Sequence, residues 1–258
     1  MNTDIERFEN ECQNGDLETV DALFDVVNGH DNVDMLKMRN ISVKNGHLNI
    51  LQFLHKKGVG IDQLCYYDDE NPLLIASVYG WVDVLDYILL QPEIDINLRT
   101  RHGGWTALMY AAHHGRIDVI DRLLQNENCQ INIQNNFGGI AIFYATQRGH
   151  SEIVDKLIVN GSDIWHIKRD GQTLLHYASR SKNKELLKRI LSLGLDVNQQ
   201  DICGWTPLMI AVKFSKKEDV EILLEYDADP RIKNNEGKTA WDYAKNEQIK
   251  NLLNQYIS

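Results

Sequence analysis

The chain has 258 residues, of which 43% are hydrophobic and 25% are charged, and its formal net charge at pH 7 is −10. This composition is close to that of ordinary globular proteins and excludes a disordered chain or a collagen-like rod. The acidic balance argues against a dedicated nucleic-acid-binding protein, which needs a basic surface. No stretch approaches the roughly eighteen consecutive apolar residues of a membrane helix, so we expect no membrane insertion.

Four cysteines are spread along the chain, and none of them forms a Cys-x-x-Cys pair. Zinc sites show paired spacing and disulfide-stapled domains are dense in cysteine, so we expect free thiols in a reducing compartment. The first residues are acidic and polar and lack the basic and apolar segments of a secretory signal. A cytoplasmic location is therefore expected, with the nucleus, or a host cell if the source is a pathogen, as alternatives.

A glycine followed by a short polar stretch and then an apolar run recurs at intervals of 31, 34, 35 and 34 residues, at Gly15, Gly46, Gly80, Gly115 and Gly149. We call the position of this recurring glycine the glycine slot. Continuing after Gly149 at intervals of 33 residues, the slot is no longer occupied by glycine, but the surrounding pattern continues. Such a period predicts a stack of repeated units. The predicted units are residues 1–33, 34–66, 67–99, 100–133, 134–166, 167–199, 200–232 and 233–258.

The first three units differ in how their first helix begins. Residues 1–36 hold ten Asp and Glu residues against Arg7 alone, a net charge of −9, which suits a polar cap on the end of a stack. The first two units lack the capping threonine, and the second reads Met38-Arg39-Asn40-Ile41 instead. The third unit reads Asn71-Pro72, an N-cap side chain followed by proline at the first helical position.

In the fourth and fifth units, apolar residues at helical spacing predict a second helix after the glycine, over 117–124 and 153–158. The glycine itself is expected to end the first helix in a left-handed conformation. The fifth unit has Ile140 where other units have a capping threonine. Replacing Ile140 with threonine should raise the unfolding midpoint, unless Ile140 packs in place of the cap.

The last three units repeat the pattern of residues 104–112, with a turn glycine, a capping threonine and a short apolar helix over 171–178, 204–211 and 237–244. Their slot positions are Lys182, Ser215 and Gln248, so their first helices are expected to end less tightly. Residues 166–217 hold ten Lys and Arg against four Asp and Glu, a net charge of +6. This basic stretch suggests an acidic partner segment across the sixth and seventh units, unless it is only a solvated outer surface.

The repeated unit resembles the ankyrin repeat family, whose motif combines a hairpin turn, a Thr-Pro-Leu-His-like helix start, a short inner helix ended by glycine and an outer helix. The resemblance covers roughly residues 4–258. It implies an all-α ankyrin-repeat solenoid of seven to eight helix-turn-helix units joined by short β-hairpin turns. A single domain over 1–258 is expected because no Pro-, Gly- or Ser-rich break interrupts the period.

The resemblance also implies that the chain binds other proteins with a concave face, built from hairpin tips and the exposed side of the inner helices. These side chains are not needed to fill the stack, so they are free to contact a partner. By slot, the candidates are Tyr67, Asp68, Glu70, Tyr79, His102, Trp105, His113, His114, Asn136, Phe137, Gln147, Arg148, Arg169, Gln172, Arg180, Ile202, Trp205, Lys213, Phe214, Asn235, Glu236, Lys238 and Glu247.

Two of these candidates, Trp105 and Trp205, lie between a turn glycine and a capping threonine, outside the predicted helix stack. Tryptophan is enriched among binding hot spots. With Tyr79, Phe137 and Phe214, the two indoles are predicted to form a discontinuous apolar strip. The alternative is that each indole lies half-buried on the next hairpin and stabilises the fold.

No catalytic or metal site is expected. Three imidazoles, His102, His113 and His114, are predicted on one face of one repeat, but no fourth ligand for tetrahedral zinc is evident nearby. Sequence motifs of serine hydrolases, zinc proteases and phosphate-binding loops are absent. We therefore expect no cofactor and no enzyme activity, and we expect His176, in the motif's histidine slot, to be structural.

The function predicted from these observations is that of a protein-protein interaction module or adaptor, monomeric by itself, with one or more proteins as partners. The alternative is a regulatory or inhibitory subunit of an enzyme complex, such as a kinase or protease assembly. A stand-alone enzyme is the third hypothesis, which assays against generic substrates would separate from the first two.

Overall fold

The computed structural model describes residues 2–29, 33–65 and 69–257. Across these ranges it contains sixteen α-helices and no β-strand, which confirms the all-α prediction. The contacts divide the chain into an N-terminal body, Met1–Asn135, and a C-terminal body, Asn136–Ser258. The division falls two residues after the predicted boundary between the fourth and fifth units. That all eight units form one domain remains a prediction.

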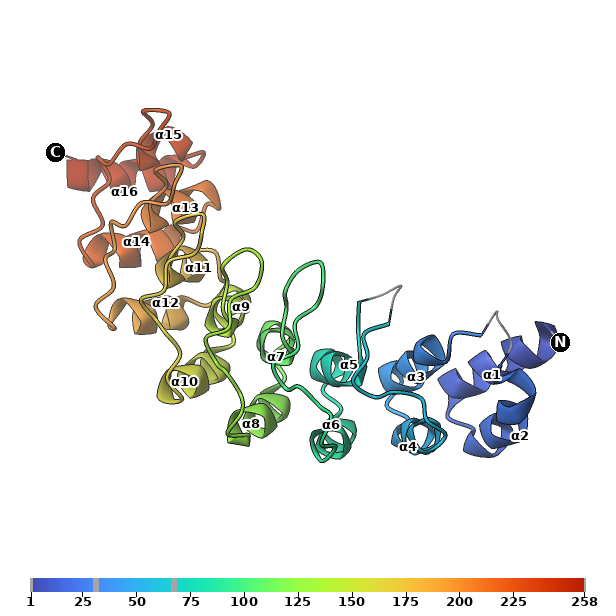
Figure 1. Cartoon of the computed structure of the whole chain (residues 1–258). Helices are drawn as coiled ribbons and strands as arrows, with labels where there is room; N and C mark the ends of the chain where they lie inside the picture. The colour runs from blue at the N-terminus through green and yellow to red at the C-terminus, as the bar shows by residue number, and fades with distance from the viewer. Residues whose placement is uncertain (1, 30–32, 66–68, 258) are drawn as a thin grey trace. The chain divides into compact units, whose positions relative to one another are not determined.

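In the N-terminal body, four helix pairs are arranged in two layers (Figure 1). The first helix of each pair contacts the first helix of the next pair, so that α1, α3, α5 and α7 form an inner layer. The outer helices pack beside them. The pairs are α1 (Asn2–Asn14) and α2 (Leu17–Val27), α3 (Met35–Lys44) and α4 (Leu48–Lys56), α5 (Pro72–Tyr79) and α6 (Val82–Leu89), and α7 (Ala107–His114) and α8 (Ile117–Gln125).

The C-terminal body has the same plan. Its inner helices α9, α11, α13 and α15 contact one another in order, and α12, α14 and α16 do so in the outer layer. The pairs are α9 (Ala141–Arg148) and α10 (Ser151–Val159), α11 (Leu174–Ala178) and α12 (Lys184–Leu191), α13 (Pro207–Lys213) and α14 (Lys217–Glu225), and α15 (Ala240–Tyr243) and α16 (Glu247–Ile257). Among the described helices, none is both long and apolar enough to cross a membrane.

The inner helices begin where the sequence predicts. The side chains of Asn71, Thr106 and Thr206 each accept a hydrogen bond from the backbone N–H three residues later, at 3.0, 3.3 and 3.3 Å. Each bond satisfies one N–H that has no partner inside the helix. Ile140 makes no such bond, and its side chain is 1% exposed. The alternative that Ile140 packs in place of the cap is therefore what the structure shows.

The inner helices also end as predicted. Five slot glycines have φ between 71° and 90°, the left-handed region in which glycine carries no steric penalty. Where the slot glycine is missing, the inner helices are shorter: α11 has five residues, α13 has seven and α15 has four, against eight in α5, α7 and α9. Ser215 occupies its slot with φ 55°, although it is not a glycine.

Replacing Ser215 with glycine is expected to raise the free energy of unfolding by about 1 kcal/mol, because an L-residue in the left-handed region carries a steric cost that glycine does not. The Ser215 side chain is exposed, so few contacts are lost. Lys182, the slot residue of the preceding unit, is not among the residues with positive φ, so Lys182→Gly serves as the control and should stabilise nothing. Urea unfolding of both variants measures the difference, and an equal gain would contradict it.

Neighbouring units are joined by side chains that follow the slot position. The side chains of Trp81, Arg116 and Asn183 each donate a hydrogen bond to a backbone carbonyl in the unit before their own, at the end of that unit's inner helix. The distances are 3.3, 2.7 and 2.9 Å. The last carbonyls of a helix have no partner within it, so these donors satisfy them and hold consecutive units together. The stack is thus held by polar contacts as well as by apolar ones.

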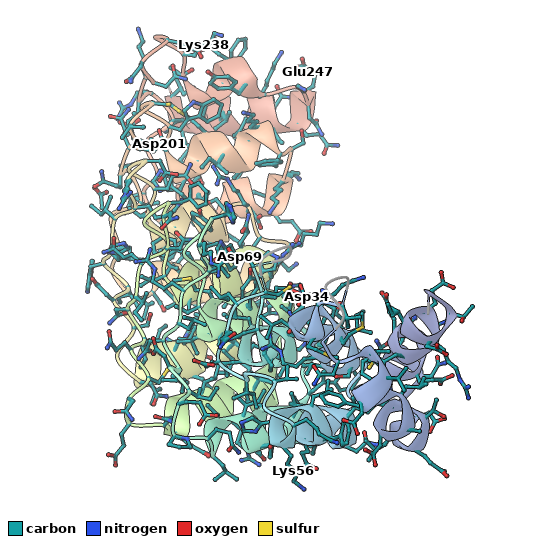
Figure 2. The ribbon with its side chains drawn as sticks, turned by 45° about the vertical axis from the view of Figure 1, so that its right-hand side comes forward. Asp34, Lys56, Asp69, Asp201, Lys238 and Glu247 are labelled. Atoms are coloured by element: carbon teal, nitrogen blue, oxygen red, sulfur yellow. The ribbon has the colours of Figure 1, made fainter. Side chains whose placement is uncertain are left out.

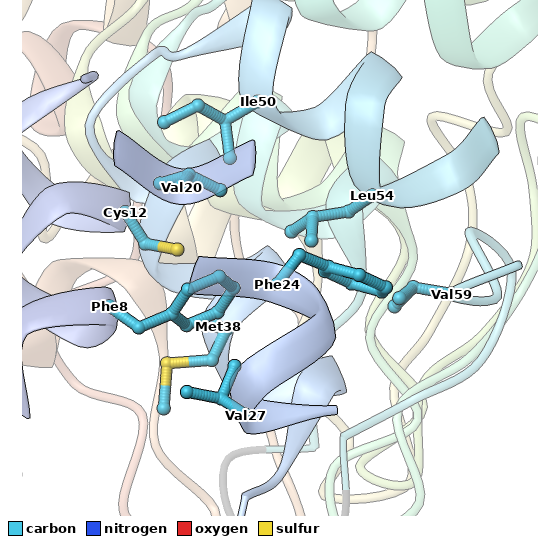
Figure 3. Packing of buried hydrophobic residues seen from close by; sticks show 9 residues of the cluster. All are labelled: Phe8, Cys12, Val20, Phe24, Val27, Met38, Ile50, Leu54 and Val59. Carbon is cyan, nitrogen blue, oxygen red and sulfur yellow. The ribbon is translucent and has the colours of Figure 1, made fainter. Parts of the chain in front are cut away.

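The first two units share one apolar core in the N-terminal body. Side chains from α1, α2, α3 and α4 converge around Phe24 (Figure 3). None of the described acidic residues before residue 30 is buried, which fits the predicted polar cap on this end of the stack. The buried residues of this core are Phe8, Cys12, Val20, Phe24, Val27, Met38, Ile50, Leu54 and Val59.

Candidate partner-binding surface

Tight loops connect each outer helix to the next inner helix, and they take the place of the predicted β-hairpins. In the C-terminal body, two backbone hydrogen bonds close each of the loops before α11, α13 and α15, for example from the Asp201 N–H to the Trp205 carbonyl at 2.9 Å and from the Gly204 N–H to the Asp201 carbonyl at 2.8 Å. These backbone hydrogen bonds are too few to form a β-ladder, and none of the described residues is in a strand. The loops therefore keep the hairpin path without a sheet.

The loops of the C-terminal body also bind one another. The Ile202 N–H donates to the Asp170 carbonyl at 3.1 Å, and the Asn235 N–H donates to the Cys203 carbonyl at 3.1 Å. Figure 2 shows Asp201 among these loops, whereas Glu247 marks the start of α16. Because each loop is bonded to the next, their side chains are held on a common, ordered platform.

Between this platform and the inner helices lies a hollow of about 300 Å³. Its floor includes Ile210, which is 3% exposed, and its apolar rim is formed by Trp205 and Phe214. Phe214 is 56% exposed, and Ile202, on the neighbouring loop, is 66% exposed. The complete lining is Arg180, Asp201, Cys203, Trp205, Ile210, Lys213 and Phe214.

The indole of Trp205 is held from two sides. Its ring centre lies 4.4 Å from that of Tyr243 in the next unit, with the planes tilted by 36°. The Lys213 ammonium lies 4.5 Å from the indole centre, within the range of a cation–π contact. Trp205 is therefore half-buried and ordered, with its remaining surface facing the hollow.

Two cations border the hollow. Arg180 donates to the Gln172 side-chain oxygen at 2.9 Å, and its guanidinium lies 5.6 Å from the ring of Tyr177. Across the described residues, neither Arg180 nor Lys213 is within 4 Å of a carboxylate oxygen. The Asp201 carboxylate in the lining accepts two backbone N–H bonds at 2.9 Å, from Cys203 and Trp205. The carboxylate nearest the hollow is thus engaged by its own loop.

His176 lies directly beneath this surface and is fully buried. Its Nδ1 accepts hydrogen bonds from the Thr173 N–H and hydroxyl, at 3.1 and 2.8 Å, while its Nε2–H donates to the Trp205 carbonyl at 3.0 Å. These bonds require a neutral imidazole. Burial lowers the pKa of His176 below its usual range. The structural role predicted for His176 is confirmed, and its position also fixes the backbone of Trp205.

Acidification is expected to destabilise the C-terminal body through His176. A histidine whose pKa is lower in the folded state contributes stability that is full above its unfolded pKa of about 6.5 and is lost as the pH falls below that value. The urea midpoint should therefore be lower at pH 5.0 than at pH 7.5. His176→Gln, which cannot be protonated there, should show a smaller difference between the two pH values. An equal pH difference in both proteins would contradict this assignment, because all other titrating groups are shared.

In the N-terminal body, the candidates form a separate aromatic cluster. The Trp105 ring centre lies 5.2 Å from that of Tyr110 and 5.7 Å from that of His113, which lies 5.0 Å from His114. Trp105 is half-buried on its own inner helix, as the stabilising alternative anticipates. His102 instead lies against the loop of the preceding unit, where its N–H donates to the Asp69 carboxylate at 3.0 Å.

The remaining candidates are placed as follows. Tyr79 is exposed at the end of α5, Arg148 is exposed at the end of α9, and Arg169 donates to the Asn136 carbonyl at 3.1 Å. Glu70 is half-buried and forms an ion pair with Lys44 at 3.0 Å. In the described part of the chain, no three His, Cys, Asp or Glu side chains are close enough to hold a metal ion. Phe137 is exposed on the loop before α9, and Tyr67 and Asp68 lie outside the described residues.

The basic stretch of residues 166–217 is divided between two surfaces. Arg169, Arg180 and Lys213 lie on the loops or at the ends of inner helices, whereas Lys168 is buried. The other six lie at the start of the outer helices or along them, and four of these six form ion pairs. The six residues are Lys182, Lys184, Lys188, Arg189, Lys216 and Lys217.

Sequence reasoning missed three lining residues of the hollow: Asp201, Cys203 and Ile210. Cys203 is exposed at a loop tip, next to Ile202. Ile202 is a candidate because it lies at the tip of a loop, and the same reasoning applies to Cys203. Ile210 is buried beneath the rim, and only the packed structure shows that it forms a floor. No pattern in the sequence indicates a depression at this particular repeat.

Comparison with known proteins identifies the repeat. A family model described as ankyrin repeats (three copies) matches residues 10–100, 40–135, 108–201 and 175–257. The ankyrin repeat protein nuc-2 of Neurospora crassa is 27% identical over 236 residues, which are 89% of this chain and 22% of that protein. Protein phosphatase 1 regulatory subunit 12A of Mus musculus is 41% identical over 83 residues, 32% of this chain and 8% of that protein.

An L-asparaginase of Dirofilaria immitis is 25% identical over 179 residues, 69% of this chain and 29% of that protein. The chain therefore spans less than a third of the length of each of these three relatives. The family model, in contrast, matches nearly the whole chain. Because these matches together cover residues 10–257, and the paired helices repeat along the same residues, the chain belongs to the ankyrin repeat family.

Proposed function

We propose that the chain is a protein-binding adaptor module that uses the loop platform and inner-helix ends of the C-terminal body. Ankyrin repeats typically mediate protein binding, and no enzyme activity is needed for that role. The observation that carries the proposal is the hollow at Trp205 with its exposed apolar rim. Large exposed apolar groups on an ordered surface are typical of interaction sites.

The chemistry of the rim supports this assignment. Tryptophan and arginine are enriched among residues that dominate binding energies, and both are present here as Trp205 and Arg180. Phe214 and Ile202 expose more than half of their surface and fill no space in the helix stack. Burying such side chains against a partner stabilises the complex without disturbing the packing of the repeats.

A partner captured by the wild-type chain tests the proposal. Phe214→Ser should abolish or strongly weaken capture, because it removes apolar surface from the rim. Val159→Ser is the matched control, since Val159 is 84% exposed but lies at the end of the outer helix α10. Equal capture by the wild type and both variants would contradict the proposed surface.

The alternative, a regulatory or inhibitory subunit of an enzyme complex, is supported by the similarity to the phosphatase regulatory subunit over 83 residues. It differs from the adaptor role in what the partner does. If the captured partner is an enzyme, its activity with and without this chain separates the two roles. Because one relative is an L-asparaginase, ammonia release from asparagine by the isolated chain should also be measured, and the adaptor role predicts none.

A further inference from the structure

The size of the hollow limits what it can accept. Its volume of about 300 Å³ lies at the lower end of the range for ligand pockets. The floor at Ile210 and the walls at Trp205 and Phe214 are apolar. Such a site has room for one large apolar side chain, which an extended peptide segment can insert.

The charges around the hollow indicate what flanks that side chain. Arg180 and Lys213 contribute two positive charges, and in the described residues neither forms an ion pair. Asp201 supplies the only negative charge of the lining, and its Oδ1 already accepts two backbone bonds. The lining therefore has a net positive charge and offers donors to a carboxylate of the partner.

A second basic hollow, of about 490 Å³, lies at the start of the outer helices and is the competing site for an acidic partner. Three of its four lysines, Lys184, Lys216 and Lys217, are already engaged in ion pairs, and Lys182 is not paired with any described residue. Lys184 pairs with Glu218 at 2.7 Å, and Lys216 pairs with Asp219 at 3.3 Å. An acidic segment would have to displace these carboxylates, and the hollow offers no apolar floor of the kind that Ile210 supplies. The loop-side hollow is the better match.

We propose that the hollow at Trp205 binds an extended acidic segment of a partner protein, inserting one bulky apolar side chain beside Trp205 and Phe214 and placing an adjacent carboxylate against Arg180 and Lys213. This proposal rests on the proposed protein-binding function of the same surface and adds the chemistry of the partner. The apolar anchor supplies affinity, and the two cations select acidic neighbours and speed association.

The probe is a random twelve-residue peptide library displayed on phage and selected against the full chain at low salt. The expected result is enrichment of peptides with one bulky apolar residue flanked by Asp or Glu. Basic or neutral enriched peptides would overturn the proposal, as would a selection that enriches no sequence. A synthetic copy of the most enriched peptide then gives affinities by fluorescence anisotropy.

Two charge reversals test the role of the cations. Lys213→Glu should weaken binding of this peptide at least about tenfold at low salt, and the affinity for the wild type should fall as salt is added. Lys188→Glu makes the same change in net charge on the outer helix α12, where Lys188 is exposed, and should leave the affinity unchanged. Equal weakening by both variants would overturn the proposal, because only a long-range charge effect would remain.

Cys203 gives a direct readout of occupancy. It is the exposed cysteine in the lining of the hollow, whereas Cys12 and Cys65 are buried and Cys129 is half-buried in the N-terminal body. The peptide should slow alkylation of Cys203 and leave that of Cys129 unchanged. Unchanged alkylation of Cys203 at saturating peptide would overturn the proposed location.

The outcomes separate this inference from the proposed function. Enriched peptides that are not acidic but protect Cys203 and lose affinity in Phe214→Ser would overturn the acidic partner and leave the binding surface standing. Peptides that bind equally well to the wild type, Phe214→Ser and Lys213→Glu would overturn both. Thermal unfolding of each variant shows whether a lost affinity reflects a lost fold.

Discussion

Replacing Gly204 with alanine is expected to lower the free energy of unfolding by about 2–5 kcal/mol. Gly204 has φ 77°, so alanine would carry a cost of about 1–2 kcal/mol from its backbone conformation alone. A Cβ at this position would also lie 2.8 Å from the Asn234 Cα and the Asn235 N. The next loop would have to move, and overpacking of this kind adds about 1–3 kcal/mol.

Gly237 provides the matched control for this prediction. Its φ of 76° is nearly that of Gly204, but no atom lies within 4 Å of a Cβ built on it, because no further loop lies against it. Gly237→Ala should therefore show the backbone cost only, and chemical denaturation measures both variants. If the two substitutions destabilise equally, the loops do not press against each other and the platform described above is not rigid.

Replacing Trp205 with alanine is expected to weaken partner binding roughly 30-fold, which corresponds to a hot-spot contribution of about 2 kcal/mol. The indole forms one wall of the hollow and is pre-positioned by Tyr243 and Lys213, so little ordering is needed on binding. The contact with Tyr243 also links two repeats. We therefore expect some loss of thermal stability in addition to the loss of affinity.

Trp105→Ala distinguishes the two effects. Trp105 occupies the same slot and is also half-buried, but it packs on Tyr110 and His113 in the N-terminal body. This variant should lose stability while keeping its affinity for a partner that binds at the hollow. If Trp205→Ala lowers only the unfolding midpoint and leaves the affinity unchanged, the indole is structural and the hollow is not the binding site.

The repeat and the helices within it can be predicted from the order of the amino acids alone. The period near 33 residues predicted the paired helices. Asn71, Thr106 and Thr206 predicted where inner helices begin, and the slot glycines predicted where they end. These features depend on a residue and its immediate neighbours, since a cap bonds three residues away and a left-handed residue is set by its own side chain. Local chemistry of this kind can be read directly from a sequence.

Which side chains are exposed and unpaired depends on how the repeats pack against one another. The period places residues one repeat apart next to each other, but it does not say whether two such side chains meet. Lys184 meets Glu218, 34 residues away, and forms an ion pair with it, whereas Lys213 lies over the indole of Trp205 and forms no ion pair with a described residue. Ile140 replaces a cap by packing, which depends on the residues around it. Whether a side chain is exposed or paired depends on the packing between repeats, and this packing exists only once the helices and loops are stacked.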